Sequence, residues 1–189
     1  MSNDSLAEPM NTARERTLNE LLVVRCQAGD QRDFELLARR WHRRLWLHAR
    51  RITGRDETAS EVMQETWLAI LAGIQRLQDP AWFPAWAHRI VRHKAADLSR
   101  RACRRRRLVA GQAAQLEAPD KGRETRADEV RAALQRLAPE AREILQLRYG
   151  SGLTMVEMAV ALELPVGTVK SRLHAARQQI RQTMQGVDQ

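Results

Sequence analysis

The sequence predicts an all-α fold, in which two small helical domains are joined by a flexible linker. Apolar residues recur at helical spacing along most of the chain, and the alternation typical of strands is absent. A segment of mixed charge with two glycines and one proline separates the two helical regions. The chain has 189 residues, 43% of them hydrophobic, and a small helical unit of about 55 to 90 residues can bury an adequate core. We expect a tail at 1–17, a first domain at 18–107, the linker at 108–127 and a second domain at 128–185.

Helices are expected in the first domain near residues 18–28, 31–53, 56–76 and 83–103. Gly29 with Asp30, and Thr53 with Gly54, supply stop and start signals, and Asp79 with Pro80 opens the loop before the fourth helix. The core-facing side of the third helix is predicted at i, i+4, i+7 and i+11, which are Met63, Trp67, Ile70 and Ile74.

The second domain is expected to end in a helix-turn-helix. A short amphipathic helix at 128–137 comes first, and Pro139 begins another that stops at Gly150. Thr154 and Glu157 match a capping box, so a third helix should run to about Glu163. After a tight turn, the last helix buries a stripe formed by Val169, Leu173, Ala176 and Ile180.

Charge points to a polyanionic partner, nucleic acid before membrane. The net charge is +9 and the isoelectric point is about 11.0. Residues 18–107 hold 19 basic and 10 acidic side chains, whereas residues 165–181 hold 4 basic and no acidic ones. The excess therefore lies in the first domain and in the last helix.

One side of the third helix is acidic in this basic domain, and it carries Glu61, Gln64, Glu65 and Leu68. A solvated face is the ordinary interpretation of such a pattern, and a docking surface is the alternative.

The loop and helix that follow combine aromatic rings with cations. This combination is typical of surfaces that bind single-stranded nucleic acid, where rings stack on bases and cations follow phosphates. Core packing is the alternative for the aromatic residues. The residues concerned are Trp82, Phe83, Trp86, Arg89, Arg92, His93 and Lys94.

The last helix has the composition of a DNA-reading helix. Gly167, Ser171 and Ala175 leave room for close approach to a groove, and Thr168 adds a hydroxyl. Lys170, Ser171 and His174 then face base edges or nearby phosphates. An amphipathic helix whose polar side is merely solvated is the alternative.

Several classes of function find no support in the sequence. Cys26 and Cys103 lie far apart and are read as plain thiols in a reducing compartment. No apolar run is long enough to cross a membrane and no signal peptide is present, so a cytoplasmic protein without membrane insertion is expected. The histidines form no metal-ligand spacing, and hydrolase and nucleotide-binding patterns are missing. We therefore expect no catalytic residue, metal, cofactor or small-molecule substrate.

Three stretches, in this order, resemble one protein family: AGDQRDFELLARRWHRRLWLHARRITGRDETASEVMQETWLAI, FPAWAHRIVRHKAADLSRR, and LAPEAREILQLRY with LTMVEMAVALELPVGTVKSRLHAARQQI. Together they are similar to the bacterial sigma-70 family of transcription initiation factors, in its small extracytoplasmic-function (ECF) group. The similarity covers about residues 18–107 and 128–182. It implies core RNA polymerase and promoter DNA as partners, and an anti-sigma factor as a further partner.

The resemblance also implies three sites. Core polymerase would dock on Glu61, Gln64, Glu65 and Leu68. The −10 element would bind Gln78, Asp79, Trp82, Trp86, Arg89, Arg92, His93 and Lys94, with a flipped base held in the loop at 78–82. The −35 element would meet Gly167, Thr168, Lys170, Ser171, Arg172, His174 and Arg177.

Some positions depart from the family pattern. Ala175 stands where many members carry Arg, and His93 stands where Asn is common, so the promoter preference of other members does not carry over. An alternative function is a stand-alone helix-turn-helix regulator that does not bind polymerase. The acidic face around Glu61 argues against it.

Overall fold

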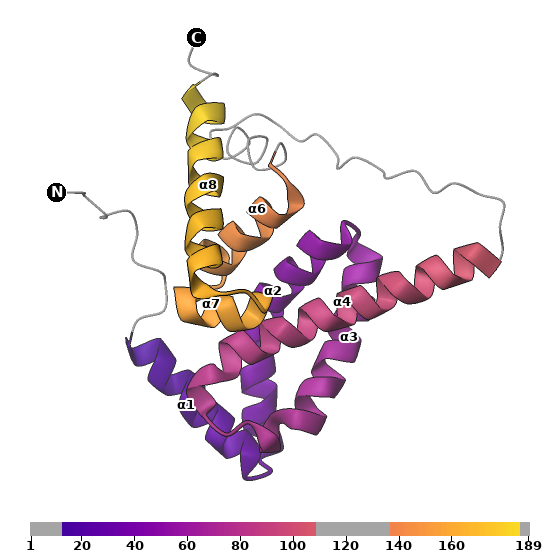
Figure 1. Cartoon of the computed structure of the whole chain (residues 1–189). Coiled ribbons are helices and arrows are strands. Elements are labelled where there is room, and N and C mark those ends of the chain that lie inside the picture. The colour runs from indigo at the N-terminus through magenta and orange to yellow at the C-terminus, as the bar shows by residue number, and fades with distance from the viewer. Residues whose placement is uncertain (1–12, 109–136, 186–189) are drawn as a thin grey trace, which may run out of the picture.

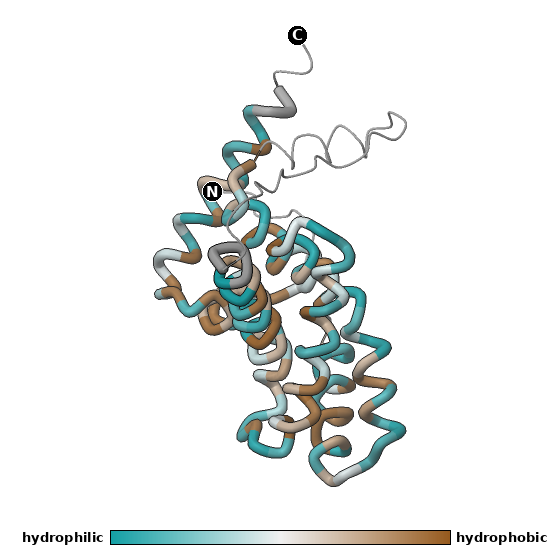
Figure 2. Tube along the Cα trace, turned by 90° about the vertical axis from the view of Figure 1, so that its right-hand side faces the viewer, coloured by the Kyte–Doolittle hydropathy of each residue, from teal (hydrophilic) through white to brown (hydrophobic). Residues whose placement is uncertain are grey.

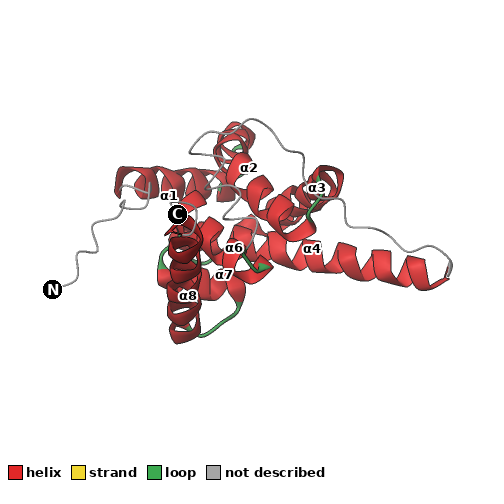
Figure 3. Ribbon diagram, turned by 90° about the horizontal axis from the view of Figure 1, so that it is seen from above, coloured by secondary structure: helices red, strands yellow, loops and turns green. Residues whose placement is uncertain are grey.

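The computed structural model describes residues 13–108 and 137–185, and every regular element in these ranges is helical (Figure 3). The first range contains α1 (Ala13–Gln27), α2 (Gln31–Thr53), α3 (Asp56–Gly73) and α4 (Phe83–Leu108), with the short 3-10 helices η1 (Ile74–Arg76) and η2 (Pro80–Trp82) before α4. The second contains α6 (Pro139–Leu145), the π-helical turn η3 (Gln146–Gly150), α7 (Met155–Leu162) and α8 (Val166–Gln185). The all-α prediction is confirmed. Apart from Leu108 and Leu137, the expected linker at 108–127 and helix at 128–137 lie outside the described residues.

Local signals set the ends of α2. The Asp30 carboxylate accepts hydrogen bonds from the backbone N–H groups of Arg32 and Asp33 at 2.9 and 3.2 Å, and so caps the helix. The helix ends at Gly54, whose φ of 76° is in the left-handed region that glycine adopts readily. Both boundaries agree with the sequence prediction.

Two other boundaries differ from prediction. Helix α1 begins at Ala13 rather than near residue 18, and α4 continues to Leu108 rather than ending near residue 103. Both added segments consist mainly of alanine and arginine, which are good helix formers. In addition, Arg16 of the added α1 turn pairs with Glu157 of α7 at 3.4 Å, a contact that the sequence pattern does not reveal.

The first domain has its own core between α1, α2, α3 and α4. Trp41 of α2 is fully buried and packs edge to face on Phe83, with ring centroids 5.7 Å apart. Of the predicted α3 stripe, Met63, Ile70 and Ile74 are buried, and Trp67 is partly buried against the same core. The tube in Figure 2 shows hydrophobic and hydrophilic residues interspersed along the helical trace, as expected when one side of a helix is buried.

A second core holds the helix-turn-helix together. Thr154 accepts a hydrogen bond from the Glu157 N–H at 3.2 Å while Glu157 accepts from the Thr154 N–H at 2.6 Å, so the predicted capping box is present. Helix α7 ends at Leu162, with Glu163 as its C-cap, and α8 buries Val169, Leu173 and Ala176 as predicted. The outline expected of a DNA-reading domain is therefore confirmed.

The two domains are in direct contact. Helix α7 lies across the N-terminal half of α4, whereas the C-terminal end of α4 projects beyond the other helices (Figure 1). Helix α6 also contacts α2. Two of the polar residues in this interface, Arg92 and His93, are among those that the sequence suggested for DNA binding.

Candidate nucleic-acid interface

The predicted reading face of α8 is exposed to solvent. Gly167, Lys170, Ser171 and His174 all lie on it, opposite the buried stripe. A Cβ atom at Gly167 would meet no atom within 4 Å, so the space beside this residue opens to solvent. The helix therefore offers a surface of small and hydrogen-bonding groups that a groove of DNA can approach closely.

The cations of α8 differ in where they lie on the helix and in what they contact. Arg177 donates a hydrogen bond from Nε to the Tyr149 hydroxyl at 2.6 Å, and its guanidinium lies 5.6 Å from the centre of that ring. Tyr149 thus fixes Arg177 at the edge of the reading face. Arg172 is exposed on the α6 side, where its charge contributes to lowering the pKa of Glu143. Arg172 accordingly lies farther from the centre of the face than Lys170 and His174.

The aromatic segment before α4 divides into core and surface residues. Phe83 is fully buried, and Trp86 packs against the core beside Gly73, where an added Cβ would be 3.0 Å from the Trp86 ring. Trp82 ends η2 and remains partly exposed, while Gln78 and Asp79 are exposed. The Asp79 carboxylate caps η2 by accepting from the Ala81 N–H at 2.9 Å. Trp82 is thus partly exposed without being part of the core, whereas Trp86 packs against it.

Two of the predicted DNA-binding residues on α4, Arg92 and His93, have partners in the second domain. Arg92 donates to the Leu162 carbonyl oxygen and pairs with Glu143 at 3.6 Å. His93 contacts the Glu163 carboxylate at 3.0 Å, and this hydrogen bond lowers the pKa of Glu163. The four predicted DNA-binding cations lie on one stretch of helix, but the second domain covers part of it.

The acidic face of α3 is only partly free. Glu61, Gln64 and Leu68 are exposed. Glu65 is instead half-buried and bridges Lys94 at 3.5 Å and Arg101 at 2.8 Å, so it ties α3 to α4. Sequence reasoning missed Leu71, which is 55% exposed and extends the apolar part of this face next to Leu68; the i, i+3 spacing was the available signal.

A buried polar cluster also escaped sequence reasoning. His48 and His88 are both fully buried, with their Nδ1 atoms 2.9 Å apart, and His48 Nε2 donates to Glu143 at 3.0 Å. Burial, together with His48 and Arg44, holds the pKa of His88 well below its usual 6.5. Burial alone would raise the pKa of Glu143, but the His48 hydrogen bond and the Arg92 charge lower it. His48 and His88 are 40 positions apart in the sequence, and His48 and Glu143 are 95 positions apart. No local sequence pattern therefore indicates that they meet.

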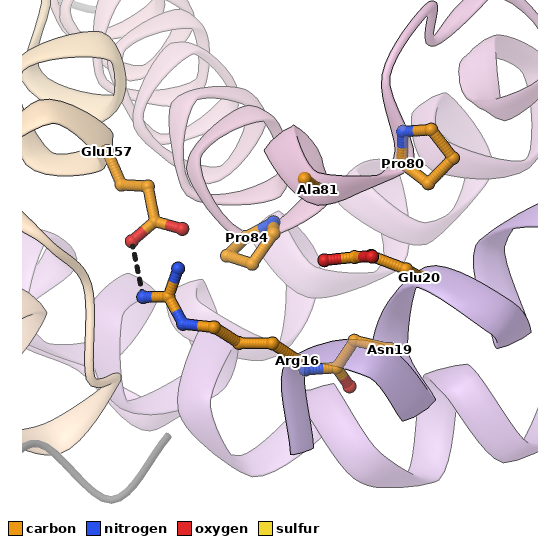
Figure 4. Close-up of a pocket in the computed structure, with 7 residues that line it drawn as sticks. All are labelled: Arg16, Asn19, Glu20, Pro80, Ala81, Pro84 and Glu157. Atoms are coloured by element: carbon orange, nitrogen blue, oxygen red, sulfur yellow. Dashed lines mark hydrogen bonds and ion pairs between the residues drawn. The ribbon is translucent and has the colours of Figure 1, made fainter. Parts of the chain in front are cut away.

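A pocket lies where α1, η2 and α7 meet (Figure 4). Arg16 points across it towards Glu157, and their side chains pair at 3.4 Å. The other lining residues are Asn19, Glu20, Pro80, Ala81 and Pro84. The second domain therefore forms one side of this pocket, and the predicted −10 loop forms part of the other side.

Two negative observations hold for the described part of the chain. No group of three or more His, Cys, Asp or Glu side chains is arranged to hold a metal ion. None of the described helices is long and apolar enough to cross a membrane.

Both cysteines are free thiols, and burial, with Asp33 and Asp30 nearby, raises the pKa of Cys26 to about 11.

Family models match both domains. The model described as Sigma-70 region 2 matches residues 37–107, and the one described as Sigma-70, region 4 matches residues 127–180. The two matches fall on the two separate hydrophobic cores.

Curated relatives carry related names. The ECF RNA polymerase sigma factor SigL of Mycobacterium tuberculosis is 35% identical over 151 residues, which is 75% of this chain and 82% of SigL. The RNA polymerase sigma-H factor of Pseudomonas aeruginosa is 30% identical over 186 residues, covering 88% of this chain and 94% of that protein. The ECF RNA polymerase sigma factor SigE of Mycolicibacterium smegmatis is 31% identical over 163 residues, and the aligned region spans only 63% of its length.

Solved structures share the fold. CnrH, in complex with the cytosolic domain of CnrY, superposes with a TM-score of 0.63 at 26% identity, covering 89% of this chain and 98% of CnrH. The sigma factor RpoE of Bartonella quintana, in complex with the anti-sigma factor NepR, gives a TM-score of 0.63 at 20% identity, with coverage of 81% and 97%.

Proposed function

The chain belongs to the sigma-70 family, in its extracytoplasmic-function group, and we propose that it uses three separate surfaces to direct core RNA polymerase to promoters. The observation that carries this proposal is the presence of region 2 and region 4, in order, on two helical domains of one chain. Sigma factors are transcription initiation factors. They act on RNA polymerase, which is a cytoplasmic enzyme in bacteria.

The exposed face of α8 is proposed to read the −35 element. Lys170, Ser171 and His174 are accessible on a helix whose segment from 165 to 181 has no acidic side chain. The N-terminal end of α8 follows the tight turn of the helix-turn-helix, so its free N–H groups can also receive a phosphate. Arg177 at the edge would contact the backbone, because Tyr149 holds its guanidinium in place.

The segment from Gln78 to Lys94 is proposed to bind the −10 element. Trp82 is partly exposed at the end of η2, which Asp79 caps, and Arg89, Arg92 and His93 follow on α4. A base that has left the stack can lie against the Trp82 ring, and the binding energy would offset the few kcal/mol that flipping costs. Trp86 would act indirectly, since it packs against the core.

The outer side of α3 is proposed to dock on core polymerase. Glu61 and Gln64 offer an acidic, hydrogen-bonding rim, and Leu68 beside Leu71 offers an apolar centre, with exposed fractions of 62% and 55%. Such a mixture is typical of protein interfaces. Glu65 would contribute by fixing α4 against α3. The CnrH and RpoE structures contain bound partner proteins, and we propose that an anti-sigma factor likewise binds this chain.

The decisive experiment is transcription in vitro with purified core polymerase on fragments of the source genome, with the RNA ends sequenced. We expect discrete start sites that share two upstream elements. Ser171→Ala should change the ranking of these sites without abolishing them. If the protein binds DNA but adds no start site to core enzyme alone, and does not co-purify with it, the stand-alone regulator is the better description.

A further inference from the structure

The hydroxyl group of Ser171 has a defined hydrogen-bonding role in the structure. Its Oγ atom lies 3.0 Å from the backbone carbonyl oxygen of Thr168, three residues earlier in α8. A carbonyl oxygen can only accept a hydrogen bond, so the hydroxyl proton of Ser171 points at Thr168. The Ser171 oxygen therefore presents only its lone pairs to the solvent, and a group that binds there has to be the donor.

The residues one turn before and one turn after Ser171 on the same face are small. Gly167 and Ala175 are four positions away on either side, and both are exposed. A Cβ atom at Gly167 would meet no atom within 4 Å. His174 pairs with Gln178 on the following turn, where the two Nε2 atoms are 3.0 Å apart. Ser171 is thus open to a group that approaches to hydrogen-bond distance.

The lone pairs of Ser171 divide the groups of DNA into those that they can and cannot bind. Phosphate oxygens, guanine O6 and N7, adenine N7 and thymine O4 are all acceptors. The donors in the major groove are the exocyclic amino groups, N6 of adenine and N4 of cytosine. Ser171 could donate to an acceptor only after its bond to Thr168 had broken. That bond therefore favours an amino group over a phosphate or a ring nitrogen.

We propose that Ser171 acts as a hydrogen-bond acceptor that reads the exocyclic amino group of an adenine or a cytosine in the −35 element. This inference rests on the proposed function, because it takes α8 as the helix that enters the major groove. Guanine and thymine would place an acceptor, O6 or O4, against the same lone pairs. Ser171 therefore selects adenine or cytosine over guanine or thymine on the strand that it faces.

The test uses the full chain as holoenzyme with core polymerase, on double-stranded promoter fragments. Binding-site selection with wild type and Ser171→Ala first locates the position whose preference the variant relaxes. We expect wild type to prefer adenine or cytosine there on one strand, and Ser171→Ala to accept all bases more evenly.

Base analogues at that position then test which partner donates. Purine in place of adenine, or pyrimidinone in place of cytosine, lacks the amino group, whereas a deaza analogue of the purine in the same base pair lacks the N7 acceptor. Loss of the amino group should weaken wild-type binding about fivefold more than binding of Ser171→Ala, which is the factor expected for one neutral hydrogen bond. The deaza analogue should affect the two proteins equally.

Ser60→Ala is the matched control, since exposed Ser60 of α3 donates in the same way to the Asp56 carbonyl oxygen at 2.9 Å. This variant should behave as wild type on every fragment. Equal losses in wild type and Ser171→Ala on the amino-free analogue would overturn the proposal, as would a difference between them that appears on the deaza analogue instead.

The proposed function can survive the failure of this inference. If Ser171→Ala relaxes no position while the holoenzyme still initiates at discrete sites, Ser171 reads no base and the promoter-directing function stands. A holoenzyme that initiates at no site beyond those of core enzyme would overturn both.

Discussion

Acidification should destabilise the first domain through His88. The side chain is fully buried between Trp41, His48 and Arg44, and its Nε2 has no hydrogen-bond partner among the described residues. Protonation would place a charge there, so the pKa of His88 is well below 6.5 in the folded protein. As the pH falls through about 6.5, the unfolded chain therefore binds up to one proton more than the folded one, and stability falls.

The size of the effect follows from this single proton. Because the unfolded pKa is about 6.5, this proton lowers the free energy of unfolding by at most about 2 kcal/mol between pH 7.5 and pH 5.0. Urea unfolding, followed by tryptophan fluorescence, measures the free energy of unfolding of the first domain. All five tryptophans lie between Trp41 and Trp86, and Trp41 is 6.2 Å from the His88 ring.

Two variants isolate the contribution of His88. His88→Gln should be less stable at pH 7.5, because His48 loses a buried partner, but its stability should change less between pH 7.5 and pH 5.0, by up to about 2 kcal/mol. His42→Gln, at an exposed histidine of the same domain, should keep the wild-type difference. Equal pH differences in wild type and His88→Gln would refute the reasoning.

The remaining predictions concern the three proposed surfaces. Glu61→Lys should weaken binding to core polymerase at least tenfold in a pull-down titration while changing stability by less than about 0.5 kcal/mol, because the residue is exposed; unchanged affinity would remove α3 from the docking surface. Trp82→Ala should reduce permanganate reactivity of −10 thymines in the polymerase complex with little effect on thermal stability, and equal reactivity would make the loop structural. Arg177→Ala should weaken binding on all promoters alike and reduce the salt slope by roughly 1. Ser171→Ala should instead relax one or two −35 positions, by about 1 to 3 kcal/mol of discrimination, at nearly constant salt slope; binding-site selection at two salt concentrations distinguishes this pair.

Helix boundaries were predictable where a local signal sets them. The Asp30 cap, the left-handed Gly54 and the capping box of Thr154 with Glu157 each involve residues within three or four positions of one another. Their energies depend on the backbone close by, so they can be read from sequence. The start of α1 at Ala13 was not found, because Arg16 there pairs with Glu157, 141 residues away.

The candidate site was predictable as a list of exposed polar residues on helix faces. Periodicity separates buried Val169 and Leu173 from exposed Ser171 and His174, and the structure confirms that separation. Helical periodicity does not show which residue on an exposed face is free to bind a partner. Glu65 is on the predicted acidic face, yet its two ion pairs with α4 are invisible to helical spacing.

The sequence by itself determined the all-α fold, the family, and the faces that carry charge, since these depend on residue type and on spacing along one helix. Only the tertiary structure decided that His48, His88 and Glu143 meet in one buried cluster and that Glu163 faces His93 across two domains. Such contacts depend on how whole helices pack, and packing is set by the summed fit of many side chains distant in sequence rather than by any short motif.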